Sequence, residues 1–376
     1  MKQTQEYTSA EEQIRNVNLG NLIKILRIKR PSSSSGQEKL AQAIKNSAVK
    51  NASIIVESNL YMVFQVEDPV DGQYTPRAFV AHMDTMHRKE GENPISVTLD
   101  KIFAVNSECL GADDGAGCWI LLEMIFAKVP GYYIFTKNEE CGGKGAQQLF
   151  MDQKGSSWFS EVSWFIEFDR KGQSDVIYEH FTGPCASLVD AKAICDLLSP
   201  LGLKPCDRGC YTDIAEFACE TVACVNLSVG YEAAHTEKEY LDLNYIKKLR
   251  NLVISVDWSR LPKPTKYDAY HYTSGIKYHS GTTYWPSSSL DEIHDSVLFP
   301  SYLETGRFTK RELKLFLRMC EMQFGITKDD FEDFEAKVRQ EETDAAYAKF
   351  SDREVEEGLD PFPGYDGGKV PNVYDY

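Results

Sequence analysis

Two adjacent aspartates stand among small residues in the stretch 111–117, which runs Gly-Ala-Asp-Asp-Gly-Ala-Gly. Small side chains permit close backbone approach and dihedral angles that larger residues rarely adopt. The next stretch, 118–126, is almost continuously apolar, which is typical of a buried helix. We therefore expect Asp113 and Asp114 to lie on a tight turn at the start of a core helix. A surface turn with an N-cap aspartate is the alternative that this stretch leaves open.

Four short apolar runs are each followed closely by side chains that bind metals. They are residues 78–81 before His82 and Asp84, 132–135 before Glu139 and Glu140, 164–166 before Asp169, and 223–227 before His235. Such runs are typical of strands buried on both faces. Helical patterns at 145–153 and 187–198 lie between them, and this alternation predicts an α/β fold. We expect a mostly parallel central sheet with helices on both faces, and functional groups beyond the carboxyl ends of its strands.

The first part of the chain precedes these runs. Its periodicity predicts amphipathic helices over residues 10–28 and 37–48, separated by the Pro-, Ser- and Gly-containing stretch 31–36. The β-branched and aromatic residues of 53–57 and 60–66 predict two strands.

The last part of the chain has a different character. Residues 309–324 and 327–350 are predicted as helices, and 351–376 as an acidic tail. We therefore divide the chain into a catalytic domain at 1–258 and a C-terminal extension at 259–376, which is irregular and then helical.

Composition restricts the partners of this chain. Its 376 residues carry a formal net charge of -16, which disfavours nucleic acid and anionic membranes and suits a cation site. No apolar run is long enough to span a bilayer, and residues 1–7 are polar, unlike a signal peptide. The ten cysteines show no paired framework, which favours reduced thiols. We expect a cytoplasmic protein with no nucleic-acid or membrane partner.

The imidazole and carboxylate groups of these clusters suit zinc. Two zinc ions about 3.5–4 Å apart suit the hydrolysis of amides or phosphates. Asp113 on its turn is a candidate bridge between two metals, with His82 and His235 as one nitrogen ligand for each. Glu140 and Asp169 would each add a terminal carboxylate. We therefore expect two Zn²⁺ ions per chain as cofactors.

Two further carboxylates are candidates for supporting the chemistry. Asp84 lies two residues after His82, and a turn at the strand end would let it hold the imidazole, as carboxylates behind metal ligands do. Glu139 precedes a candidate ligand and is placed to take a proton from water at the metals.

In this order the motifs resemble those of the co-catalytic zinc exopeptidases, which include the M28 and M42 aminopeptidases and the M20 peptidases. The likeness covers about residues 12–255. Too few residues separate Asp169 from His235 for the lid of the M20 enzymes. Too few separate His82 from Asp113 for the domain inserted in the M42 enzymes, so the spacing is most similar to M28.

The resemblance implies a ligand set for each zinc. One zinc would bind His82, Asp113 and Asp169. The other would bind His235, Asp113 and Glu140. Asp113 would therefore bridge the two ions.

The resemblance also implies roles for neighbouring groups. Glu139 matches the general base of the family, and the peptide bond between Asp113 and Asp114 matches one that is cis. An aminopeptidase must also bind a free α-amine, and acids such as Asp213 are candidates for that contact.

We therefore expect a zinc-dependent exopeptidase, most similar to aminopeptidases that remove N-terminal residues from peptides through water bridged by two zincs. The substrate would be a peptide or a small amide, and homo-oligomerisation stays open. One alternative is a carboxypeptidase, amidase or N-deacylase of the same clan. The other is a non-catalytic binding module on the same fold.

Overall fold

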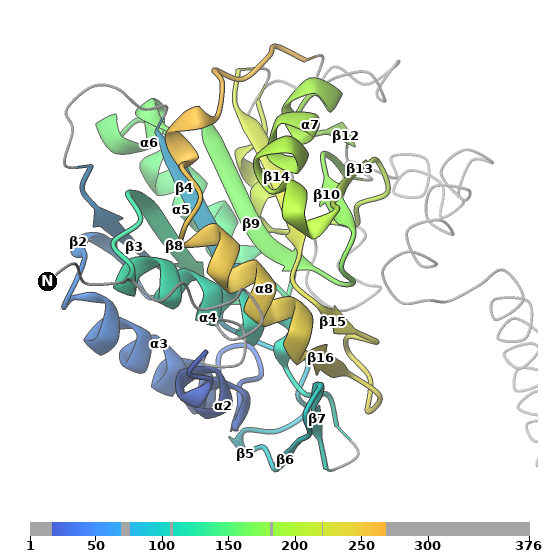
Figure 1. Ribbon diagram of the computed structural model, residues 1–376. Helices are drawn as coiled ribbons and strands as arrows, with labels where there is room; N and C mark the ends of the chain where they lie inside the picture. The colour runs from blue at the N-terminus through green and yellow to red at the C-terminus, as the bar shows by residue number, and fades with distance from the viewer. Residues whose placement is uncertain (1–16, 69–75, 106–107, 181–182, 220, 268–376) are drawn as a thin grey trace, which may run out of the picture. The chain divides into compact units, whose positions relative to one another are not determined.

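An eight-stranded sheet forms the centre of the protein (Figure 1), in the order β13-β10-β14-β9-β4-β8-β3-β2. The computed structural model describes residues 17–68, 76–105, 108–180, 183–219 and 221–267. The strands are β2 (Ser53–Glu57), β3 (Tyr61–Val66), β4 (Arg77–His82), β8 (Gly131–Thr136), β9 (Trp164–Arg170), β10 (Asp175–Ile177), β13 (Lys204–Cys206) and β14 (Ala223–Ser228). The four central strands β14, β9, β4 and β8 are mutually parallel, whereas β10, β3 and β2 join antiparallel to their inner neighbours.

Helices cover both faces of this sheet. One apolar layer holds α2 (Gly20–Leu26), α3 (Ser35–Ala48), α4 (Ala112–Phe126), α7 (Leu188–Leu197) and α8 (Leu243–Val253). The other layer holds α5 (Lys144–Gln153), α6 (Ser157–Glu161) and the 3₁₀ helix η2 (Asp213–Phe217). Alternate residues of a strand enter opposite layers, as Phe79 and Val80 of β4 do. The predicted α/β fold with a mostly parallel sheet is confirmed.

Smaller sheets lie outside the central one, and the sequence did not predict them. A four-stranded sheet has the order β15-β16-β7-β6, and two short pairs are β1 with β5 and β11 with β12. Their bounds are β1 (Ile28–Lys29), β5 (Gly91–Glu92), β6 (Ile95–Val97), β7 (Lys101–Ala104), β11 (Glu179–His180), β12 (Gly183–Pro184), β15 (Tyr231–Glu232) and β16 (Tyr240–Asp242). The remaining 3₁₀ helices are η1 (Ser199–Leu201) and η3 (Trp258–Arg260). The four-stranded sheet positions a candidate ligand, because β15 and β16 flank the loop that carries His235.

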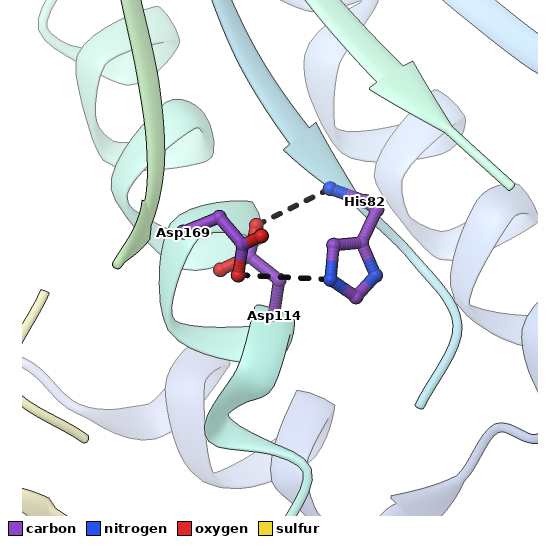
Figure 2. Close-up of side chains that lie close together, drawn as sticks. All are labelled: His82, Asp114 and Asp169. Carbon is purple, nitrogen blue, oxygen red and sulfur yellow. Dashed lines mark hydrogen bonds and ion pairs between the residues drawn. The ribbon is translucent and has the colours of Figure 1, made fainter. Parts of the chain in front are cut away.

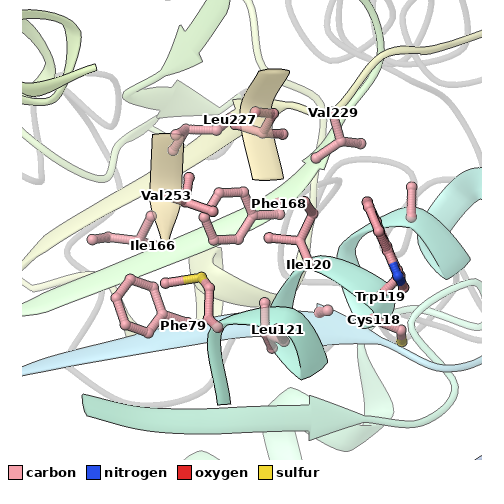
Figure 3. Packing of buried hydrophobic residues seen from close by; sticks show 14 of the residues in the cluster. Phe79, Cys118, Trp119, Ile120, Leu121, Ile166, Phe168, Leu227, Val229 and Val253 are labelled. Carbon is pink, nitrogen blue, oxygen red and sulfur yellow. The ribbon is translucent and has the colours of Figure 1, made fainter. Parts of the chain in front are cut away.

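Helix α4 begins at the paired aspartates, as predicted. Gly111 has a φ of 72°, and Asp113 and Asp114 keep non-helical angles within the first turn. A Cβ on Gly111 would come within 3.0 Å of neighbouring side chains, so glycine suits both the angle and the space. The helix then turns into the core, where Figure 3 shows Ile120 beside Phe168 of β9. The surface-turn alternative is therefore wrong, because the helix that follows is buried between other elements.

The first predicted helix, over residues 10–28, is only partly correct. Among the described residues the helix spans Gly20–Leu26, because Ile28–Lys29 pairs as a strand with Gly91–Glu92 instead. The helix predicted over 37–48 is confirmed, and the side chain of Ser34 caps it by accepting a hydrogen bond from the backbone of Gln37.

The predicted C-terminal extension, residues 259–376, falls mostly outside the described residues. Its helices at 309–324 and 327–350, its acidic tail and the boundary after residue 258 stay predictions. Within the described ranges, none of the helices combines the length and the apolar character that crossing a membrane requires.

The aromatic core of the central sheet gives a stability prediction. Phe79 is fully buried, and its ring centroid lies 5.0 Å from that of Trp258 and 5.3 Å from that of Tyr133. We expect Phe79→Ala to lower the free energy of unfolding by about 3–5 kcal/mol, since a cavity is left. Leu99→Ala is the control: Leu99 is 96% exposed, and its loss should cost within about 0.5 kcal/mol. Urea unfolding followed by tryptophan fluorescence measures both, and equal losses would contradict the packing described.

A buried histidine gives a pH prediction. Burial lowers the pKa of His180 to about 4; its contact with the carbonyl oxygen of Cys210 opposes the shift and the charge of Arg170 adds to it. In the unfolded chain this pKa is near 6.5, so the unfolded state takes up the proton first as the pH falls. The stability gained from neutral His180 is therefore complete above about pH 6.5 and is lost towards about pH 4.

We expect this residue to lower the free energy of unfolding by about 2 kcal/mol between about pH 7 and pH 5. His180→Asn keeps a side-chain N–H for the Cys210 carbonyl but does not titrate, so that part of the pH dependence should disappear. Urea unfolding at both pH values compares parent and variant. The same pH dependence in both proteins would show that His180 is not held neutral.

Candidate metal centre

The candidate ligands meet at one edge of the central sheet. His82 is the last residue of β4, and Glu139 and Glu140 follow the end of β8. His235 lies in the loop between β15 and β16. Asp169 differs from expectation: it lies within β9 and not after it, because the pairing with β14 continues to the end of the strand. The carboxyl ends of parallel strands share an edge, which is why residues so far apart in the sequence converge.

The first group of ligands surrounds the ring of His82. Its Nε2 lies 3.1 Å from Oδ1 of Asp113 and 3.6 Å from Oδ1 of Asp169. The His82 side chain is completely buried, and the two carboxylates are almost so. Three potential ligand atoms thus converge within a small, enclosed volume.

The second group surrounds the ring of His235. Its Nε2 lies 3.2 Å from Oδ2 of Asp113 and 3.2 Å from Oε2 of Glu140. The His235 side chain is 34% exposed, so this group is open to solvent on one side. The two oxygens of Asp113 therefore face one histidine each, which is the arrangement of a bridging carboxylate.

These distances fit zinc. Two ligand atoms, each about 2.1 Å from one tetrahedral zinc ion, lie roughly 3.4 Å apart. The four histidine–carboxylate distances given above are all within 0.3 Å of that spacing. Oε1 of Glu140 is buried and has no hydrogen-bond partner among the described residues, which leaves its lone pairs free for a metal. Two sets of three possible ligand atoms lie within 4.8 Å of one another, one from His82, Asp114 and Asp169 and the other from His82, Asp113 and Glu140.

The charges of the centre also suit a cation. Burial opposes protonation of His82, but the charge of Asp169 and the hydrogen bond to Asp113 raise its pKa well above the usual value. Burial likewise opposes protonation of His235, whose pKa is nevertheless raised to about 12 by Glu140 and Asp113. Enclosed carboxylates thus attract positive charge to both rings. A divalent cation bound between these carboxylates would balance the same negative charge.

Asp114 lies close to the first group but has a different task. Its Oδ2 accepts a hydrogen bond from the backbone N–H of His82 at 3.2 Å, and its Oδ1 accepts one from that of Gly117 at 3.0 Å. Figure 2 shows it beside His82 and Asp169. Because both oxygens are engaged with backbone amides, Asp114 supports the end of β4, while Asp113 faces the histidines. The peptide bond between the two aspartates is cis, as the resemblance implies.

Asp84 connects two of the ligand segments. Its Oδ1 lies 3.5 Å from Nδ1 of His82, at the outer limit of hydrogen bonding. The same oxygen accepts from the backbone N–H of Glu139 at 3.0 Å, and Oδ2 accepts from that of Glu140 at 3.2 Å. Ser32 donates its hydroxyl to Oδ2 at 2.6 Å. Asp84 therefore fixes the turn that presents both glutamates, and its expected role in holding the imidazole stays a prediction.

Glu139 points towards the same centre without belonging to either group. Its Oε2 lies 4.0 Å from Nε2 of His82, and its side chain is 12% exposed. Burial, together with the charges of Glu140 and Asp169, raises the pKa of Glu139 well above the usual value, although His82 opposes the shift. A largely buried carboxylate with a raised pKa beside the candidate ligands has the properties of a general base.

Three polar residues that the sequence analysis missed hold Asp169. Tyr231 donates its hydroxyl to Oδ1 at 3.0 Å, and Thr212 donates to Oδ2 at 3.1 Å. Asn226 accepts from the backbone N–H of Asp169 at 2.9 Å. Thr212 precedes Asp213 directly, and the sequence had singled out that neighbour. No local pattern marks Tyr231 or Asn226, because both reach Asp169 from another strand.

Asp213, a candidate for contact with a free α-amine, is enclosed by the protein. The side chain of Asp213 is fully buried and accepts a hydrogen bond from the hydroxyl of Thr136. Burial raises its pKa to about 7. Glu167 is also fully buried, and burial, with the charge of Asp169, raises its pKa well above the usual value.

Comparison with known proteins shows that this chain shares its fold with a solved peptidase structure. No family model matches the sequence, and no curated protein sequence matches it. A tripeptidase from Staphylococcus aureus matches the structure with a TM-score of 0.50 at 14% identity, over 65% of this chain and 96% of that chain. The resemblance to exopeptidases is thus confirmed at the level of the fold.

Two further solved structures match with lower scores. An aminopeptidase from Bacillus cereus has a TM-score of 0.48 at 14% identity, over 65% of this chain and 98% of that one. A Pyrococcus horikoshii peptidase that can assemble into a tetrahedron or a large octahedral shell has a TM-score of 0.47 at 16% identity, over 63% and 98%. At 14% identity the tripeptidase establishes the fold alone, so the activity must be argued from this chain's own residues.

The contacts of Asp84 give a prediction about metal affinity. Asp84→Asn replaces one oxygen by an amide group that cannot accept from the backbone N–H groups of Glu139 and Glu140. We expect zinc affinity to fall by about 10–100-fold, because a misplaced support misplaces the ligands it holds. Asp100→Asn, on an exposed turn, is the control and should bind zinc as the parent does. Chelator competition measures both affinities, and an unchanged Asp84→Asn would show that this carboxylate does not orient the centre.

Proposed function

We propose that the protein is a zinc-dependent exopeptidase, and most specifically an aminopeptidase. The observation that carries this proposal is the position of Asp113, whose two oxygens lie 3.1 and 3.2 Å from the imidazoles of His82 and His235. A carboxylate shared in this way, with Asp169 and Glu140 as outer ligands, suits two metal ions. The shared fold with a tripeptidase supports the same class of reaction.

The ligand set suits zinc because it combines imidazole nitrogen with carboxylate oxygen. His82, Asp113 and Asp169 would hold one ion; His235 and Glu140, with the other oxygen of Asp113, would hold the second. When bound, zinc supplies Lewis-acid chemistry, which polarises a scissile carbonyl and acidifies water. The protein's part is to keep the five ligands converged and the centre partly closed to solvent.

Glu139 moves the proton in this proposal. Its Oε2 would accept the proton of the attacking water and return it to the leaving amine. Burial and the charges of Glu140 and Asp169 raise the pKa of Glu139, which favours uptake of the water proton by this carboxylate. Asp84 keeps Glu139 in place through its backbone N–H, with an N···O distance of 3.0 Å. The adjacent Glu140 faces His235. In this proposal Glu139 therefore transfers the proton, and Glu140 binds the metal.

Two alternatives share most of this evidence. A carboxypeptidase, amidase or N-deacylase would use the same ligands and base, and would differ in which end of the substrate it recognises. A non-catalytic binding module would need neither the base nor all five ligands, and here the six side chains converge. A peptide or small amide is the proposed substrate. The cytoplasmic location expected from the sequence belongs to the same proposal, and homo-oligomerisation stays open.

Paired substitutions of the two glutamates test the proposed roles. Glu139→Gln keeps the size of the side chain and removes the base, so turnover should fall by about 10²–10⁴-fold while zinc binding survives. Glu140→Gln should weaken zinc binding first, because it removes a ligand charge. Metal analysis and hydrolysis of aminoacyl chromogenic substrates are measured for the parent and both variants. Loss of zinc from Glu139→Gln but not from Glu140→Gln would exchange the two roles.

A substrate panel distinguishes the exopeptidase classes. The parent protein should cleave peptides that have a free N-terminal amine and leave their N-acetylated counterparts intact. Cleavage of the N-blocked peptides alone would replace the aminopeptidase assignment by a carboxypeptidase or deacylase. A zinc-loaded parent that cleaves neither set would favour the binding module.

A further inference from the structure

Glu239 is a buried carboxylate that the proposed mechanism does not use. It is 1% exposed and accepts hydrogen bonds from three consecutive backbone amides. Its Oε2 lies 2.9 Å from the N of Gly111, and its Oε1 lies 2.8 Å from that of Ala112 and 3.1 Å from that of Asp113. Three successive N–H groups around one anion form a strong, directional contact.

No side chain close in the sequence caps these three backbone N–H groups. Gly111 is the N-cap of α4, and its segment makes no side-chain cap. The first N–H groups of a helix need acceptors, and burial makes an unmet group costly. Glu239 supplies the acceptor from another part of the chain, 128 residues beyond Gly111.

The loop that carries Glu239 also carries a candidate metal ligand. His235 precedes it by four residues and lies 3.2 Å from Oδ2 of Asp113. The loop is closed by a hydrogen bond from the N–H of Glu239 to the carbonyl of Thr236, at 3.1 Å, and β16 begins directly afterwards. One short loop therefore contacts Asp113 at two points. His235 lies against the carboxylate of Asp113, and Glu239 accepts a hydrogen bond from the backbone N–H of Asp113.

A second buried side chain holds the opposite side of the same segment. Arg30 is fully buried and donates from Nη2 to the carbonyl oxygen of Gly111 at 2.9 Å. It also donates to the carbonyl of Met83, next to His82, at 2.9 Å. With Glu239 on the N–H side and Arg30 on the C=O side, the segment that presents Asp113 has little freedom to rotate.

We propose that Glu239 is a positioning residue of the metal centre. By binding the amides of Gly111, Ala112 and Asp113, it orients the Asp113 carboxylate so that two imidazoles share it, and it links that carboxylate to the His235 loop. The metal-binding part of this inference rests on the proposed function. The contact with the backbone does not.

An ordinary helix cap would stabilise α4 without affecting the metals, so the test must separate the two roles. Glu239→Gln replaces one acceptor oxygen by a donor, which opposes the backbone N–H groups. Glu237→Gln is the matched control, since Glu237 lies in the same loop and is exposed. Glu239→Asp keeps the charge but is one methylene shorter, so it cannot reach all three amides.

Two measurements are made on the full chain. The first is amide hydrogen exchange of residues 111–113 in metal-free protein. We expect faster exchange there in Glu239→Gln, and parent rates in Glu237→Gln. The second is zinc affinity by chelator competition, which should fall by about 10–100-fold in Glu239→Gln and less in Glu239→Asp.

Each outcome decides a part of the proposal. Parent exchange rates in Glu239→Gln would overturn the backbone contact, and parent zinc affinity despite faster exchange would reduce Glu239 to a helix cap. Should Glu239→Gln fail to fold, Glu239→Asp decides by the same two criteria. A parent protein that binds no zinc would overturn the proposed function, whereas the exchange rates would still decide the backbone contact.

Discussion

The candidate centre depends on one carboxylate placed between two imidazoles. Asp113 presents Oδ1 to His82 and Oδ2 to His235, and the two rings come from different sheets. His82 ends a central strand, while His235 lies in a loop of the smaller four-stranded sheet. A metal site tolerates deviations of only about 0.2 Å in its ligand distances. The packing of the two sheets must therefore be accurate at this one residue.

That accuracy comes from hydrogen bonds to the backbone of the ligand segments. Buried polar side chains accept from backbone N–H groups of the ligand segments: Asp84 from Glu139 and Glu140, Asp114 from His82, Asn226 from Asp169, and Glu239 from Gly111, Ala112 and Asp113. A buried N–H without an acceptor costs about 1–3 kcal/mol, so each contact is strongly preferred to its absence. Since the acceptors come from other segments of the chain, they fix the ligand segments relative to one another. The candidate ligands are thus positioned largely through their backbone, and Asp169 is also held through its side chain by Tyr231 and Thr212.

Much of the fold, and the meeting of the candidate ligands at one edge of the sheet, was predictable because it follows from local patterns. Strands buried on both faces appear as short apolar runs, and in parallel strands the next residues reach a common edge. His82, Glu140 and His235 could be identified from that rule, and Asp113 from the small residues around it. The resemblance to zinc exopeptidases added the pairing of these residues, and the structure brings the same side chains together.

Some features of this protein leave no periodic or local pattern in the sequence, and only the tertiary structure shows them. The sequence left the four-stranded sheet unpredicted, and it gave no sign that β9 continues through Asp169 or that Asp213 is enclosed. The support of Asp113 by Glu239 spans more than a hundred residues, so no neighbouring residues mark it. The sequence by itself determined which chemical groups stand at the ends of which strands, because that depends on hydrophobicity and chain order. Their burial, their mutual distances and the amides that hold them arise only when separate segments pack, because these contacts join residues from different elements.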